Sequence, residues 1–243
     1  MGVSIVRQSG GLFPVPYVAS KEILEDYPAR ALNPYFFRTK LQPLTFTLTF
    51  SCESAVINIA KLNSIASWLC QSTYKPFISE DNPDRVYYIM ATNQIDFMTN
   101  GVQQGYFEIE FRCQHPYALT LAATPSYDSV YDYSDPSETQ FTIHNDDNVH
   151  EYFYPIFELT LGGTGTSIYI YNYATGLQST FTTLSANEVL YVDNQKKIIV
   201  SSTGSYRYDN FDKEWFKLVQ GDNLIGIGGY CTIEFLLQYP IWT

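Results

Sequence analysis

The sequence predicts a mainly β protein of two domains: an N-terminal β-sandwich or α+β domain with one main helix, and a C-terminal β-sandwich. Three observations predict this class. Aromatic residues make up 16% of the 243 residues, which favours sheets because flat side chains pack well on pleated surfaces. Short runs alternate between apolar and polar residues along most of the chain. Charge is divided unevenly between the two halves, which indicates two units with different surroundings.

The charge division sets the domain boundary. Residues 1–124 carry 9 Lys and Arg against 10 Asp and Glu, whereas residues 125–243 carry 5 against 15. The change falls in a polar, acidic stretch with two prolines. We therefore predict a first domain over 1–124, a linker over 125–136 and a second domain over 137–243; whether the last residues return to the first domain is left open. The acidic half repels phosphate, so any DNA near it should slide rather than bind tightly.

The first half predicts an irregular start followed by strands. Residues 1–40 contain two adjacent glycines and four prolines, at positions 14, 16, 28 and 34, which predict irregular structure. Residues 44–50 alternate strictly and predict a strand with one apolar face. Residues 86–90 and 106–113 predict two more strands, the latter with Phe and Ile side chains inward and glutamates outward.

One helix is predicted over residues 54–72, and it has two apolar sides. The main stripe recurs at steps of three and four residues and consists of Ala55, Ile59, Leu62, Ala66 and Leu69. Ile57, Ile65 and Trp68 form a second strip about a third of the way round. A helix that needs cover on two sides packs either wholly within its own domain or partly against a neighbouring subunit. We take Ile57, Ile65 and Trp68 as the predicted oligomer interface.

The patterns of the second half predict β-strands throughout. Its alternating runs are residues 167–171, 189–192, 198–200 and 231–237. Turn residues separate them, including Asp193-Asn194 and Gly221-Asp222-Asn223. Closely spaced strands without a helical period between them predict a β-sandwich.

Cysteine usage and hydropathy predict a soluble protein made in a reducing cytoplasm. The four cysteines lie far apart, with no CxxC pair, so buried free thiols are expected rather than zinc ligands or a disulfide framework. The N-terminus lacks the apolar core of a signal peptide. No stretch approaches the ~20 apolar residues of a membrane span, so no membrane association is expected.

Candidate catalytic and metal-binding residues do not assemble into a site in the sequence. His144 and His150 bracket an Asp/Asn run, but the order matches neither a calcium loop nor a helical zinc pair, which favours a solvated turn. Cys113 and His115 share a strand face, yet Cys113 lies on the inward side, which favours a core role. Residues 162–166 are glycine-rich but precede no helix and no lysine, which favours a hairpin turn over a phosphate site. We predict no catalytic residues, no cofactor, no metal and no enzymatic activity.

Two series of motifs, taken in order, resemble the siphophage distal tail protein family. In the first half, a helix ending at residues 67–70 leads to residues 85–88 and then to a strand whose end, Cys113 to Tyr117, reads Cys-x-x-Pro-Tyr. In the second half the corresponding segments are residues 154–159, 171–176, 188–193 and 218–225. The order and spacing of the whole set carry the resemblance, which spans residues 44–243.

The resemblance implies a structural protein of the virion tail tip, assembled in the bacterial host cytoplasm. Members of this family form a hexameric ring at the baseplate. The N-terminal domain lines a central channel for DNA passage, and a galectin-like sandwich projects outward. The implied partners are other copies of the chain, the major tail tube protein, the tape-measure protein, the tail-associated hub protein and the receptor-binding protein or its adaptor.

Two other functions compete with this interpretation. The first is a carbohydrate-binding lectin-like module for attachment to the host surface, with Tyr206, Tyr208 and Trp215 as an aromatic platform. The second is a cell-wall hydrolase, which needs a cleft with paired carboxylates that the strand patterns do not supply.

Overall fold

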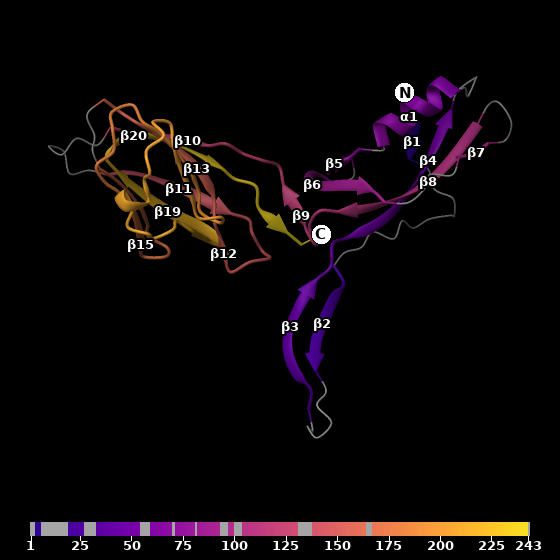
Figure 1. Ribbon diagram of the computed structural model, residues 1–243, viewed down its shortest axis with the longest axis horizontal. Coiled ribbons are helices and arrows are strands. Elements are labelled where there is room, and N and C mark those ends of the chain that lie inside the picture. Colours follow the sequence, from indigo (N-terminus) through magenta and orange to yellow (C-terminus); the bar gives the residue numbers. More distant parts are fainter. Residues whose placement is uncertain are drawn as a thin grey trace. The chain divides into compact units, whose positions relative to one another are not determined.

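The computed structural model describes residues 3–5, 19–26, 33–53, 59–69, 71–80, 82–92, 97–99, 104–130, 138–163 and 167–242, and the structural findings below concern these residues (Figure 1). The chain divides into two compact units. The first runs to Leu119 and includes Trp242, and the second spans Thr120–Ile241. Over the described residues, no helix has both the length and the hydrophobicity needed to cross a membrane.

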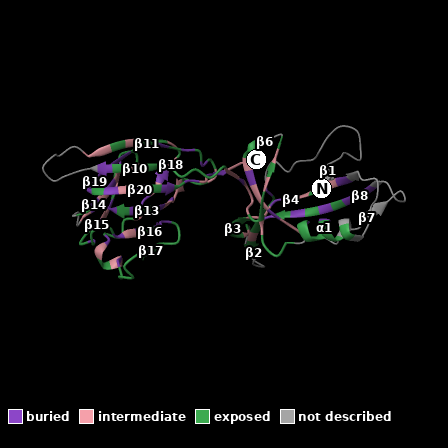
Figure 2. Cartoon of the chain, turned by 90° about the horizontal axis from the view of Figure 1, so that it is seen from above, coloured by how far each residue is buried: buried purple, intermediate pink, exposed green. Residues whose placement is uncertain are grey.

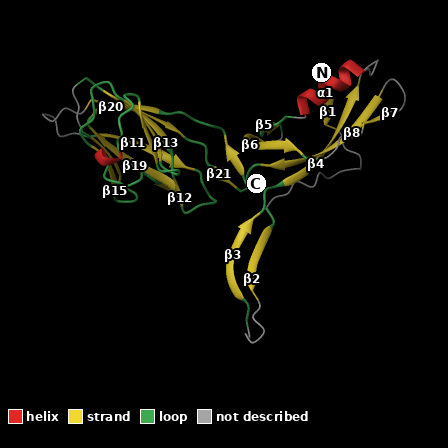
Figure 3. Cartoon of the chain, in the orientation of Figure 1, coloured by secondary structure: helices red, strands yellow, loops and turns green. Residues whose placement is uncertain are grey.

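The first unit contains a large antiparallel sheet and the α-helix α1 (Ile59–Leu69) (Figure 3). Within the described part of the first unit, the strands of this sheet follow the order β1-β4-β8-β6-β9, with β5 paired to β6 and β7 paired to β8. These strands are β1 (Val3–Ile5), β4 (Thr45–Glu53), β5 (Lys75–Ser79), β6 (Asn82–Ala91), β7 (Phe97–Thr99), β8 (Gln104–Cys113) and β9 (Ala118–Thr120), whereas β21 (Pro240–Ile241) lies among the residues of the second unit.

The alternation of β8 builds the core of the first unit. Phe107, Ile109, Phe111 and Cys113 are buried, as predicted, while the glutamates between them are exposed. Opposite Phe107 on β4 lies Phe50, and their rings stack with centroids 5.1 Å apart. Burial of large aromatic side chains on one face of the sheet stabilises this unit.

Residues 71 and 72 are not helical, so the helix ends before the predicted residue 72, and the buried residues described on it do not follow the predicted stripe. Ile65 and Leu69, one turn apart, are buried in the core of the first unit, whereas Ala66 is exposed. Figure 2 shows exposed residues over much of α1. Since one buried residue comes from each predicted strip, the helix rests on its sheet along a line between the two strips. Residues 54–58 and 70, within the predicted helix, lie outside the described residues.

Residues 1–40 are not irregular throughout, which corrects the prediction. Strands β2 (Lys21–Asp26) and β3 (Tyr35–Leu41) pair as an antiparallel hairpin. We call this hairpin the arm. At its base, the Gln42 side chain donates a hydrogen bond to Glu22 and the Gln42 backbone N–H donates to Ser20 O.

The second unit is a sandwich of two antiparallel sheets. In the described part of the chain, one sheet has the order β10 (Ser126–Val130), β20 (Tyr230–Leu236), β13 (Ile156–Leu161), β16 (Val189–Asp193) and β17 (Ile198–Ser201). The other has the order β11 (Thr139–Asn145), β19 (Gly221–Gly228), β14 (Ile168–Asn172) and β15 (Leu177–Phe181). A third pair joins β12 (Tyr152–Phe153) to β18 (Leu218–Val219). Strand β10 falls inside the predicted linker and pairs along β20, so the first part of that stretch belongs to the sandwich.

The core of the second unit lies between the two sheets. Phe157 and Phe235 come from one sheet, Ile170 and Ile225 from the other, and all four are almost completely buried in one cluster. The predicted sandwich of the second half is therefore confirmed. Alternation along each strand sends these apolar residues inward and polar residues outward.

Buried amide side chains complete the turns that the sequence indicated. Asn223 is fully buried; its side-chain amide donates to the carbonyls of Val219 and Gly221, and its Oδ1 accepts from the Val219 N–H. Asn194 is also buried, donates to Pro155 O and accepts from the Phe216 N–H. Each amide therefore satisfies backbone groups that the turn leaves without strand partners.

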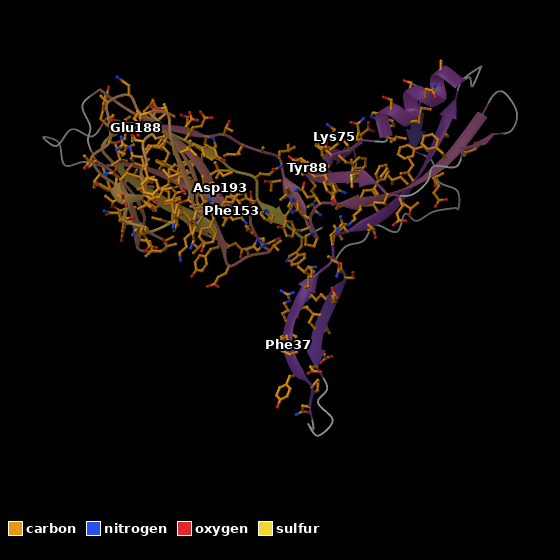
Figure 4. All side chains as sticks on the ribbon, in the orientation of Figure 1. Phe37, Lys75, Tyr88, Phe153, Glu188 and Asp193 are labelled. Atoms are coloured by element: carbon orange, nitrogen blue, oxygen red, sulfur yellow. The ribbon has the colours of Figure 1, made fainter. Side chains whose placement is uncertain are left out.

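A buried ion pair fixes the loop between β17 and β18. Glu188, just before β16, accepts two hydrogen bonds of 2.7 Å from Nε and Nη2 of Arg207. The Glu188 carboxylate also accepts from Ser201 Oγ and from the Ser185 N–H. Figure 4 labels Glu188 among the side chains of the second unit. Burial alone would raise the pKa of Glu188, but the hydrogen bonds from Arg207, Ser201 and Ser185 lower it below its usual value.

We expect Glu188→Gln to destabilise the second unit by about 3–5 kcal/mol at pH 7, because it leaves the buried Arg207 without a counter-charge. A carboxylate with a lowered folded pKa stabilises the fold above its unfolded pKa, and that contribution is lost as pH falls through the folded pKa. Wild-type stability should therefore fall below about pH 4, and the variant should lose part of this slope.

Hydrogen exchange of peptides from β13 and β16, measured at pH 7 and again below about pH 4 with intrinsic exchange rates corrected for pH, measures the effect. Glu158→Gln, on the exposed face of β13, is the matched control and should change stability by less than about 0.5 kcal/mol. Equal effects of the two variants would contradict the role of the ion pair.

Candidate functional site

The arm exposes more apolar surface than any other described part of the first unit. Phe36 and Phe37 on β3 are 62% and 67% exposed, and Tyr35 and Ile23 are similarly exposed. Neither strand of the arm pairs with any other described strand. A two-stranded hairpin is marginally stable alone in water, and a group of large exposed apolar side chains on one element favours an interaction surface. The arm is therefore the first candidate contact surface.

A β-bulge displays the aromatic side chains at the end of the arm. Leu24 pairs with Arg38 and Glu25 pairs with Phe36, so Phe37 is the extra residue on β3. Bulges bend the strand and re-aim side chains. Figure 4 shows Phe37 on β3.

A groove of about 280 Å³ lies on the first unit, lined by residues of α1, β4, β5, β6 and β8. Its lining is mainly apolar and includes the buried Phe50, Ile89 and Phe111 together with the more exposed Trp68, Lys75 and Pro76. The Gln71 side chain donates to the carbonyls of Ser67 and Trp68, which caps the end of α1 beside the groove. The groove is the second candidate contact surface.

The three predicted interface residues have different positions. Trp68 is 49% exposed, lines the groove and packs edge-on against Phe50, with ring centroids 6.4 Å apart. Ile65 is buried in the core of its own unit, so it presents no surface to a neighbour and the prediction needs correction there. Ile57 lies outside the described residues.

An aromatic ladder in the second unit runs from the core to the surface. Phe181 stacks on Phe211, which packs edge-on against Trp215. Tyr208 lies 6.5 Å from Trp215, and Tyr206 lies 5.1 Å from Tyr208, measured between ring centroids. The three aromatic residues of the predicted platform are thus neighbours, and Tyr206 is 70% exposed. Arg207, between the two tyrosines, is held by Glu188, so the exposed ring sits on a fixed loop.

The cysteine–histidine pair of the sequence does not form a catalytic arrangement. Cys113 is fully buried, and burial raises the pKa of its thiol to about 12. The ring of His115 stacks on Tyr117, and burial lowers the pKa of the His115 imidazole. A nucleophilic thiol requires access and a lowered pKa, and Cys113 has neither. Cys231 is likewise buried and free, with its pKa raised by burial to about 12.

The two histidines that bracket the Asp/Asn run have separate partners. His144 Nδ1 lies 2.6 Å from Asp222 Oδ1, and that hydrogen bond raises the pKa of His144. His150 Nδ1 lies 3.0 Å from Asp147, whose buried carboxylate also accepts from the His150 and Val149 N–H groups. Within the described residues, no group of three or more His, Cys, Asp or Glu side chains is placed to hold a metal ion. Asp147 therefore serves as a turn-building residue.

Comparison with known proteins covers nearly the whole chain. Residues 1–115 match the phage tail protein N-terminal domain, and residues 126–237 match the phage tail C-terminal domain. The SPbeta prophage-derived uncharacterized protein YomH of Bacillus subtilis (strain 168) is 28% identical over 252 residues, which cover 98% of this chain and 92% of the relative. The crystal structure of the Dit protein of SPP1, described as a paradigm of the hub adsorption apparatus in phages infecting Gram-positive bacteria, is similar with a TM-score of 0.66. The similarity covers 97% of this chain and 93% of that chain at 13% identity.

Proposed function

Because the chain belongs to a family of phage tail proteins, we propose that it is a distal tail protein that forms a hexameric ring at the tail tip or baseplate. In this role it joins the tail tube to the hub and receptor-binding proteins and leaves a central channel through which DNA passes. The first unit forms the ring and the second docks partners. The function is structural and not enzymatic, and a zymogram on host cell wall should show no clearing.

The observation that carries the self-association is the exposed arm. Its large side chains, Phe36 and Phe37 above all, remain in water on the single chain. Burial of one such side chain stabilises a complex by about 1.5–3 kcal/mol, so a contact that covers several of them supports assembly. The near balance of charge in residues 1–124 lets copies approach without strong repulsion.

The proposed partners follow from the position in the tail. The tail tube protein and the tape-measure protein lie on one side of the ring, and the tail-associated hub protein and the receptor-binding protein or its adaptor lie around and below it. Assembly takes place in the host cytoplasm. The excess of acidic residues in 125–243 favours basic partner surfaces for the second unit.

We expect purified protein, alone or with its tail neighbours, to form six-fold rings by negative-stain electron microscopy. Trp68→Glu should raise the concentration needed for assembly by on the order of 10- to 100-fold, because it places a charge at the half-exposed edge of the groove. Tyr230→Glu, at an exposed aromatic residue of the second unit, is the control and should assemble normally. Monomers under both conditions would contradict the ring.

A second candidate function is binding of a neutral saccharide by the aromatic ladder. Tyr206 presents an exposed ring on a loop that the buried Arg207–Glu188 pair holds in place. Sugar rings stack on such fixed aromatic faces, and the exposed polar Asp209 follows nearby in the loop. The acidic character of this half disfavours polyanionic glycans.

If this second function holds, Tyr206→Ala should weaken glycan binding by roughly tenfold, which corresponds to the loss of one stacking contact. A glycan array followed by calorimetry on the best ligand measures it. Tyr173→Ala, at an exposed tyrosine outside the ladder, should leave the affinity unchanged. An array on which the wild-type protein binds nothing would exclude the lectin function.

A further inference from the structure

We propose that the arm of one copy inserts Phe36 and Phe37 into the groove of the next copy, so that neighbours join head to tail. This inference rests on the proposed self-association and names the two surfaces that make the contact. The donor surface is the arm, and the acceptor is the groove lined by α1, β4, β5, β6 and β8.

The donor surface presents aromatic side chains that are suited to insertion into a pocket. Phe36 and Phe37 lie next to each other at the bulge of β3, with most of their surfaces in water. Aromatic side chains bring a large contact area at low cost in conformational entropy, because each has only two rotatable side-chain bonds. Anchors of this kind fill pockets at the centres of interfaces.

The acceptor surface has room for an aromatic ring and matching walls. An engineered apolar cavity of roughly 150 Å³ holds a benzene molecule, and the groove measures about 280 Å³. Its interior presents the rings of Phe50 and Phe111, and Trp68 stands half-exposed at its side. An inserted Phe would meet ring edges and faces, the arrangement that aromatic clusters prefer.

Charge also matches between the two surfaces. Lys75 lines the groove and is exposed, whereas Glu25 and Asp26 pair with Phe36 and Tyr35 on the arm. Figure 4 labels Lys75 on β5 and Phe37 on β3. Insertion of the aromatic residues brings a basic residue beside two acidic ones. Charged groups at the rim of an interface contribute chiefly to partner choice and association rate.

A second copy is the occupant that these features favour over an unrelated protein. The donor and the acceptor are different patches of one chain, so their contact is heterologous, and heterologous contacts close into rings when the rotation permits. Each copy then uses one arm and one groove. An arm that paired with another arm would leave the groove uncovered and bring the acidic ends of the two arms together.

Site-specific crosslinking tests the contact. p-Benzoylphenylalanine replaces Phe37, and copies grown in ordinary and ¹⁵N medium are mixed, assembled with the tail neighbours present where needed, and irradiated. The expected products join the arm peptide of one isotope to groove peptides of the other, within residues 68–77 or 89–91. Arm-to-arm crosslinks, crosslinks to the second unit, or products confined to a single isotope would overturn the proposal.

Surface substitutions give an independent readout. Phe36→Ser with Phe37→Ser should raise the concentration for half-assembly by on the order of 100-fold or more, while the melting curve measured below the assembly concentration stays unchanged because both side chains are exposed in the single chain. Ile78→Ser, an exposed apolar residue of β5 that does not line the groove, should assemble like wild type. Equal effects of the two changes would refute insertion.

The proposed ring and the proposed contact between arm and groove can be disproved separately. Six-fold rings without arm-to-groove crosslinks would leave the ring function standing and remove the proposed contact. Absence of rings and of all crosslinks between copies, alone and with the tail neighbours, would remove both.

Discussion

The first unit depends on one constraint: a two-stranded hairpin has no second layer against which to bury its side chains. Strands of the large sheet are covered on one face by α1 and by one another's aromatic rings, and Phe107 and Ile109 leave water completely. The arm has no such cover among the described residues, so Phe36 and Phe37 stay exposed. These exposed side chains are the observation on which the proposed self-association rests.

The second unit buries the apolar side chains of its core without a partner. Its two sheets bury each other, and the Glu188–Arg207 pair, inside a hydrogen-bonded network, ties the longest loop to the sandwich. Breaking such a pair is costly because one charge remains buried. The loop therefore holds its conformation without a partner, and Tyr206 is exposed on a rigid support. The first unit thus leaves large apolar side chains of the arm exposed, whereas the second unit buries its core between its own two sheets.

The sequence predicted those parts of the fold in which local patterning and tertiary burial agree. Residues 106–113 alternate and are buried alternately, and the sandwich of the second half followed from strand spacing and turn residues. The resemblance to phage distal tail proteins is confirmed by the family domains that match both halves. The arm was missed because Lys21, Glu22, Glu25 and Asp26 hide the strand pattern of an element with no buried face. Ile65 was misassigned because helical periodicity gives the spacing of apolar residues but not the angle at which the helix meets its sheet.

The uneven charge distribution connects these surfaces to a role in a tail. In the proposed six-fold ring, copies that pack side by side around an axis bring equivalent surfaces close together, and a strongly charged unit would raise the repulsion with every added copy. The half that holds both the arm and the groove carries 9 basic and 10 acidic residues, whereas the strongly acidic half contains neither. This distribution supports the proposed self-contact through the neutral unit. In the proposed assembly, the excess of acidic residues in the second unit favours partner surfaces of opposite sign.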